Sequence, residues 1–132
     1  MEIHHLPSGI SGVTLLALDG GLDHTTTALF VAEMDGLLEA GNARVVLNLA
    51  KLTYVSSWGL AAMVRVHHHF AARGGRIVFA NLHSAMATIL RLSRLDHLFD
   101  LYPTVADAVR SIAPKPDSAG SAENRPGGPI NP

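Results

Sequence analysis

The stretch from Val45 to Phe70 reads VVLNLAKLTYVSSWGLAAMVRVHHHF, and the rest of the chain is expected to fold around it. Val45–Leu49 is an apolar run of strand length without alternation, which is typical of a strand covered on both faces. After a connection predicted at Lys51–Tyr54, Ser56 and Ser57 stand where a helix is expected to begin. Residues spaced by three and four along that helix predict its inward face, which contains Leu60, Met63, Val64 and His67.

The two serines would lie at the positive end of a helix dipole, beside backbone N–H groups that have no partner within the helix. Such a place suits an anion. The simpler interpretation is that both serines only cap the helix. Trp58 follows them in the first helical turn, where an aromatic side chain is either a surface anchor for a partner or partly buried against a neighbouring loop.

The remaining segments alternate between strand and helix patterns. Strands are predicted at Ile3, Val13–Leu18, Arg76–Ala80 and Leu98–Tyr102. Three further helices are predicted from apolar residues at helical spacing, which would face inward. The first has Phe30, Met34, Leu37 and Leu38, the second has Met86, Ile89, Leu90 and Leu92, and the third has Val105, Ala108, Val109 and Ile112. Ser84 is a predicted N-cap, and Thr104 with Asp107 resembles a capping box.

This order predicts an α/β fold: a single domain with a mixed, mostly parallel sheet of about four to five strands and about four helices. In such sheets functional sites gather beyond the carboxyl ends of the strands. The loops at Gly20–Thr25, Tyr54–Gly59 and Asn81–Ser84 all follow strands, so we expect them to share one edge. Their candidate binding residues are Asp23, His24, Ser56, Ser57, Trp58, Asn81, His83 and Ser84.

Length and composition set further bounds. The 132 residues predict one domain at 1–113 and a disordered tail at 114–132, where Pro, Gly, Ser and Asn dominate. A net charge of -1 and 5% aromatic residues argue against nucleic acid as a direct partner. No apolar run reaches membrane-spanning length, and no secretory signal is visible. The absence of cysteine favours a cytoplasmic protein.

Catalytic and metal sites are not predicted. His67, His68 and His69 are consecutive, so on a helix they point in different directions and cannot converge on one ion. His24 and His83 could approach each other, but no third ligand has suitable spacing. No acid, base, nucleophile or cofactor pattern emerges either, so an enzyme is not expected, and no cofactor.

The segment from about Ile3 to Ala113 resembles a STAS domain of the anti-sigma-factor antagonist family. Leu18–His24 is similar to the end of the family's second strand, which is typically G-x-L-D. Val45–Leu49 and Tyr54–Leu60 resemble the central strand and the S-S-x-G-L variant of its D-S-S-G-L turn. Ile77–Leu101 is similar to the strand, helix and L…F segment that follows in the family.

The resemblance implies a protein without catalytic residues that binds an anti-sigma factor with serine kinase activity. That partner would phosphorylate Ser57, release of the antagonist would follow, and a serine phosphatase would reverse the modification. Ser56 stands where many members carry aspartate, and Trp58 replaces a small residue. The alternative is a non-switching STAS scaffold or sensor module in a signalling or transporter complex, in which Ser57 is only a cap. A homodimer is compatible with both.

Overall fold

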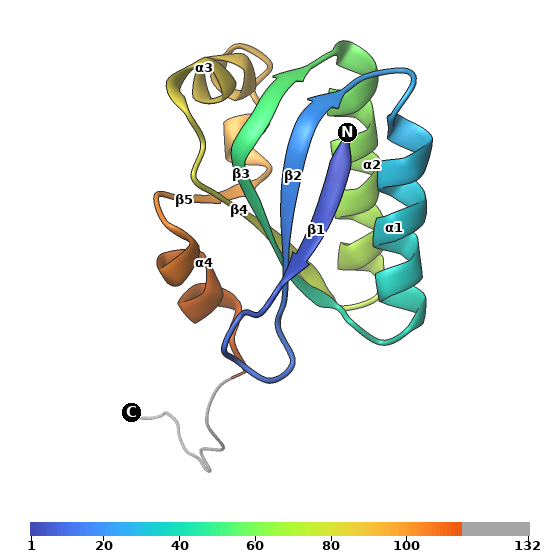
Figure 1. The fold of residues 1–132 in the computed structure, drawn as a ribbon, viewed down its shortest axis with the longest axis vertical. Coiled ribbons are helices and arrows are strands. Elements are labelled where there is room, and N and C mark those ends of the chain that lie inside the picture. The colour runs from blue at the N-terminus through green and yellow to red at the C-terminus, as the bar shows by residue number, and fades with distance from the viewer. Residues whose placement is uncertain (115–132) are drawn as a thin grey trace.

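Five strands form one sheet in the order β1-β2-β3-β4-β5 in the computed structural model, which describes residues 1–114. Strand β1 is antiparallel to β2, and the other neighbouring strands are parallel (Figure 1). The predicted mixed α/β sheet is therefore confirmed. The elements are β1 (Glu2–Leu6), β2 (Thr14–Leu22), α1 (Thr27–Glu39), β3 (Arg44–Val55), α2 (Ser57–Ala72), β4 (Arg76–Ala80), α3 (Ser84–Leu92), a 3-10 turn (Leu95–His97), β5 (Asp100–Tyr102) and α4 (Val105–Ile112).

Strand β3 is much longer than predicted, because Lys51–Tyr54 is strand and not a connection. It spans 12 residues, and its second half pairs with the end of β2 through irregularities in the register. Strand β4, in contrast, pairs with β3 only as far as Asn48 and Ala80. The end of β3 therefore projects beyond β4, and the turn that follows it projects with it.

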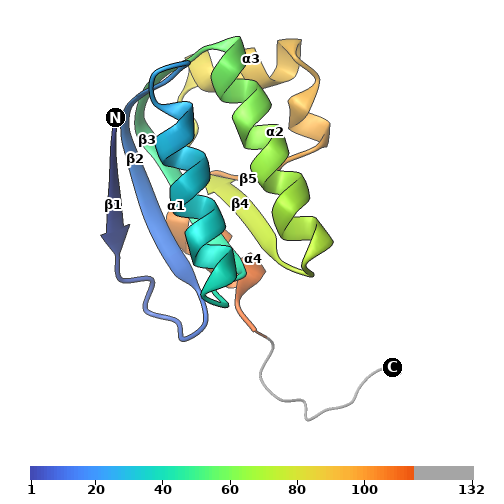
Figure 2. The ribbon, with the colours of Figure 1, turned by 90° about the vertical axis from the view of Figure 1, so that its right-hand side faces the viewer.

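The two faces of the sheet are covered differently. Helices α1 and α2 lie side by side across one face (Figure 2), and their buried residues are Phe30, Met34, Leu38, Ala62, Met63, Val66 and Phe70. Met86 and Leu90 of α3 join the same core. Leu92, predicted to point inward, is 79% exposed. Helix α4 covers part of the other face, where a smaller core contains Val46, Val78, Ala108, Val109 and Ile112.

The helix starts follow the predicted chemistry in part. The hydroxyl of Thr104 accepts a hydrogen bond from the backbone N–H of Asp107 at 3.1 Å, which confirms the predicted cap of α4. The N-cap of α3 is His83 and not Ser84, which is the first helical residue. The predicted tail lies outside the described residues apart from Pro114.

Candidate functional site

The turn between β3 and α2 is built around Ser56, which is the N-cap of the helix. Its hydroxyl accepts a hydrogen bond from the backbone N–H of Gly59 at 3.3 Å. Its own backbone N–H donates to the carbonyl oxygen of Leu22 at 2.9 Å, which ties this turn to the end of β2. The capping interpretation is thus correct for Ser56, whose side chain is already occupied within the chain.

Ser57 differs from its neighbour. It is the first residue of α2, its side chain is exposed, and within residues 1–114 its hydroxyl forms no hydrogen bond. The N-terminal turn of a helix carries a partial positive charge and N–H groups without intrahelical acceptors. An anionic group attached to Ser57 would therefore be placed favourably with respect to α2. Of the two serines, Ser57 is the one whose hydroxyl takes part in no hydrogen bond among the described residues.

Gly59 brings α2 unusually close to β2. A Cβ at this position would lie 2.4 Å from the carbonyl oxygen of Leu22 and 2.8 Å from Cγ1 of Val55. Both distances are far below van der Waals contact, so no larger residue fits without moving the backbone. The glycine fixes the direction in which α2 leaves the turn, and with it the position of Ser57.

Asp23 supplies a fixed negative charge at the same edge of the sheet. Its Oδ1 accepts hydrogen bonds from the hydroxyl and the backbone N–H of Thr25 at 2.6 and 2.9 Å. Its Oδ2 accepts one from the hydroxyl of Tyr54 at 2.5 Å. The hydrogen bonds from Thr25, and then that from Tyr54, lower the pKa of the Asp23 carboxyl. The same contact raises the pKa of Tyr54.

The ring of Tyr54 reaches Asp23 by crossing Gly21, the residue opposite Tyr54 in the ladder between β2 and β3. A Cβ on Gly21 would lie 2.1 Å from the ring. Tyr54, Gly21 and Thr25 therefore hold the predicted residue Asp23 in place, and none of the three is among the predicted binding residues. A tyrosine and a glycine one strand apart carry no local signal that they will meet.

Trp58 lies at the surface with 67% of its area exposed. It lines a hollow of about 520 Å³ between α1 and α2, together with Thr27, Ala28, Val31, Ala32, Ala61, Ala62 and Arg65. Of the two alternatives for Trp58, surface exposure or partial burial against a loop, the structure has the exposed one. An exposed tryptophan beside small apolar side chains offers a partner a large contact area next to Ser57.

The third predicted loop is arranged differently. The amide of Asn81 donates to Oδ1 of Asn48 at 3.2 Å, and Nε2 of His83 lies 2.8 Å from the carbonyl oxygen of Leu52. Asn48 precedes Val55 by seven residues, roughly 20 Å along the strand. Asn81 therefore lies well away from the turn that carries Ser57.

Two further predicted residues are exposed. His24 adjoins Asp23 in the loop after β2, and Ser84 begins α3. Figure 1 shows β2 and β3 ending at the same edge, from which α1 and α2 descend. The bond from Ser56 to Leu22 and the bond from Tyr54 to Asp23 join the ends of β2 and β3. Asp23, Ser56 and Ser57 therefore belong to two adjoining turns.

In the part of the chain that the structure describes, His24 and His83 belong to no group of three potential metal ligands, and neither do His67, His68 and His69. None of the helices among residues 1–114 has the length and apolar character that a membrane span requires.

Comparisons with known proteins agree with this architecture. Residues 7–108 match the STAS domain family. The anti-sigma F factor antagonist of Paenibacillus polymyxa is 24% identical over 102 residues, which make up 76% of this chain and 87% of that protein.

Two solved structures illustrate the shared fold. An anti-sigma factor antagonist from Mycobacterium paratuberculosis has a TM-score of 0.72 and 22% identity, over 84% of this chain and 94% of that one. The Bacillus cell fate determinant SpoIIAA in its phosphorylated form has a TM-score of 0.63 and 17% identity, over 83% and 99%. At such identities the likeness concerns the fold.

Proposed function

The chain belongs to the STAS domain family, and we propose that it is an anti-sigma-factor antagonist whose binding is switched off by phosphorylation of Ser57. The observation that carries this proposal is the contrast between the two serines. Ser56 holds the helix cap, whereas Ser57 is exposed and its hydroxyl has no hydrogen-bond partner within residues 1–114. The name of the Paenibacillus polymyxa relative supports the general role.

The partner in this proposal is an anti-sigma factor with serine kinase activity. We expect it to contact the switch surface, which we define as Asp23, His24, Ser57 and Trp58. Trp58 would provide the apolar anchor, and the ionised carboxylate of Asp23 would fix the orientation of a complementary basic group. A serine phosphatase would restore the binding form.

The switch itself is electrostatic. A phosphate on Ser57 adds a charge of about -1.5 to -2, which the N-terminus of α2 stabilises within the folded domain. At the interface, the same charge lies beside Asp23 and exceeds the charge that the partner's basic group neutralises. The phosphate must also be desolvated there, which opposes binding. Folding is therefore retained while binding is lost, without any reaction catalysed by this chain.

Mass spectrometry of the protein incubated with ATP and the candidate anti-sigma kinases of its source organism tests the modification. We expect one added phosphate, mapped to Ser57 and absent from Ser57→Ala. Ser56→Ala is the matched control, since it removes the neighbouring hydroxyl and should still be phosphorylated. Phosphate on Ser56, or none with a kinase that binds the protein, would contradict the proposal.

Binding of the same kinase tests the switch. Ser57→Asp introduces a charge and Ser57→Asn introduces the same volume without it, so the comparison isolates the electrostatic effect. We expect calorimetry to show at least a 10-fold weaker complex for Ser57→Asp than for Ser57→Asn, equivalent to about 1.4 kcal/mol. Equal affinities, together with self-association that survives Ser57→Asp in sedimentation, would favour the non-switching scaffold instead.

A further inference from the structure

Three potential metal ligands meet on the open face of the sheet, on strands β1 and β2. Glu2 and His4 are two residues apart on β1 and so point to the same side, and Asp19 is the ladder partner of Glu2 on β2. Nε2 of His4 lies 3.2 Å from Oε1 of Glu2 and 3.9 Å from Oδ2 of Asp19. One ligand atom from each residue falls within 4.8 Å of the other two.

These separations suit a small divalent ion. Zinc binds imidazole nitrogen and carboxylate oxygen at about 2.0–2.2 Å, so two ligands of a tetrahedral site stand roughly 3.4 Å apart. The distances from Nε2 of His4 to the two carboxylate oxygens, 3.2 and 3.9 Å, lie on either side of that value. Small rotations of these surface side chains would close the difference. One neutral imidazole and two carboxylates also give the site a charge opposite to that of the ion.

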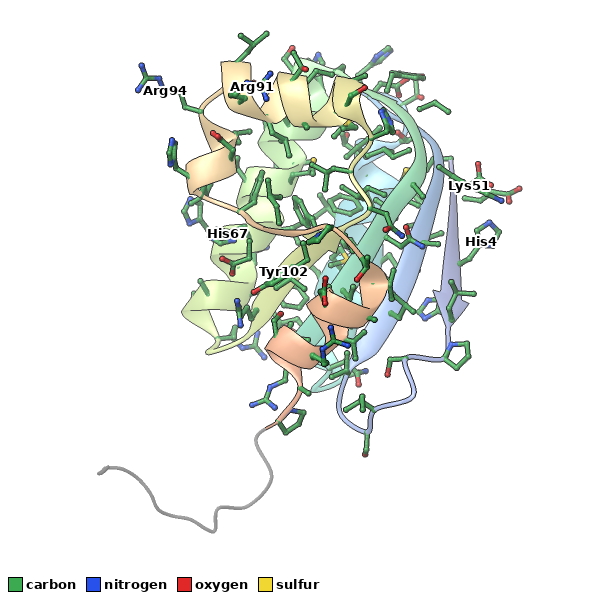
Figure 3. The ribbon with its side chains drawn as sticks, turned by 90° about the vertical axis from the view of Figure 1, so that its left-hand side faces the viewer. His4, Lys51, His67, Arg91, Arg94 and Tyr102 are labelled. Carbon is green, nitrogen blue, oxygen red and sulfur yellow. The ribbon has the colours of Figure 1, made fainter. Side chains whose placement is uncertain are left out.

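The surface beside these residues is hollowed. A cavity of about 420 Å³ is lined by His4, Leu6, Ala17, Leu18, Asp19, Asn48, Ala50 and Lys51. Helix α4 leaves this part of the sheet uncovered, and Figure 3 shows His4 and Lys51 near each other beside β1. The hollow gives room for the water molecules or the small ligand that would complete the coordination of an ion held by three protein groups.

We propose that Glu2, His4 and Asp19 bind a divalent transition-metal ion of the zinc class. The pairing of β1 with β2 sets the relative positions of the three ligands before the ion arrives, which lowers the cost of assembling the site. Lys51 lines the same hollow and is the ladder partner of Asp19, so its positive charge would compete with the ion for the carboxylates. This site is separate from the switch surface and does not depend on the proposed function.

The alternative for the same atoms is an ion pair between a protonated His4 and its two carboxylates. Such a pair would contribute little, because Glu2 and His4 are exposed and Asp19 is only half-buried. The two interpretations differ in a measurable way. A metal site requires neutral imidazole and saturates with added ion, whereas an ion pair involves no added ion at all.

The test is a titration of the untagged, full-length protein with Co²⁺, which is paramagnetic and accepts the ligands that zinc accepts, followed by amide-resolved NMR. We expect residues 2–6 and 17–20 to respond first, with saturation at a single site. His4→Ala should weaken binding about 10-fold or more, and Asp19→Asn should do so independently. Lys51→Ala should strengthen it.

His5→Ala is the matched control, because His5 lies on the same strand but contacts only one carboxylate, Glu33, at 2.9 Å. It should leave Co²⁺ binding unchanged. A first response around His67–His69, or unchanged affinity in both His4→Ala and Asp19→Asn, would overturn the proposal.

Discussion

The turn after β3 and the turn after β4 begin from the same sequence pattern, since each joins a buried parallel strand to a helix through polar residues. Their side chains are nevertheless used in opposite ways. After β4, Asn81 and His83 turn inward and bond to Asn48 and to the backbone of Leu52. After β3, Ser57 and Trp58 point into solvent, while Ser56 alone serves the fold.

The difference originates in the length of β3. Because this strand continues for seven residues beyond its last pairing with β4, its own turn projects from the sheet, whereas the turn after β4 lies against the flank of β3. Asn81 and His83 lie next to another strand and find partners there, whereas the hydroxyl of Ser57 at the projecting tip has none among residues 1–114. A polar turn thus becomes a candidate contact surface only where the chain itself leaves its groups unpaired.

The largest effect should come from Gly59, which holds the projecting turn against β2. Gly59→Ala would place a Cβ 2.4 Å from the carbonyl oxygen of Leu22 and should lower the free energy of unfolding by about 3 kcal/mol. Urea denaturation followed by circular dichroism measures this decrease in the free energy of unfolding. Gly36→Ala is the control, because nothing lies within 4 Å of a Cβ there and a helical alanine is favoured. A loss below about 1 kcal/mol at Gly59 would mean that the turn is not held as described.

The turn after β4 should lose stability when Asn81 is replaced, because this residue has a φ of 60° and bonds to Asn48. Asn81→Ala removes the hydrogen bond and puts alanine in the left-handed region, so we expect a loss of about 1–2 kcal/mol. Asn81→Gly removes the hydrogen bond alone and should cost less. The kinase affinity should not change with either substitution. A weaker complex at unchanged stability would move Asn81 into the binding surface and remove the contrast between the turns.

Replacing Ser56 and replacing Ser57 should have clearly different effects on the free energy of unfolding, measured by the same urea denaturation. Ser56→Ala removes the N-cap hydrogen bond to Gly59 and should cost about 1 kcal/mol. Ser57→Ala removes an exposed hydroxyl that has no hydrogen-bond partner within residues 1–114, so its stability should stay within about 0.5 kcal/mol of that of the unmodified chain. Equal costs would show that both serines are structural and would return Ser57 to the role of a cap.

The alternation of strands and helices could be predicted from sequence because it depends on local apolar runs, and the Ser56–Ser57 turn because helix capping is local. The length of β3 could not be predicted. Lys51–Tyr54 has one buried residue, Leu52, between polar neighbours, and it becomes strand only because β2 extends beside it. The contact of Asp23 with Tyr54 joins residues 31 positions apart and depends on that same extension.

The smallest effect concerns the charge beside the turn. Tyr54→Phe removes the second contribution to the lowered pKa of Asp23, so that pKa should rise while staying below its ordinary value, because the hydrogen bonds from Thr25 remain. A carboxyl whose pKa is lowered by folding adds stability above its unfolded pKa, and this is lost as the pH falls through the folded value.

In Tyr54→Phe the loss of stability should therefore be smaller and should be complete at a higher pH, because only the folded pKa rises. NMR titration of the Asp23 carboxyl measures the change, and Tyr102→Phe is the control, because the Tyr102 hydroxyl contacts Arg76 instead. An unchanged Asp23 pKa in Tyr54→Phe would mean that the tyrosine does not hold this carboxylate. Asp23 would then be oriented by its own loop alone. The long end of β3 would serve the switch surface only by carrying the start of α2, with Ser57 and Trp58, beyond the sheet.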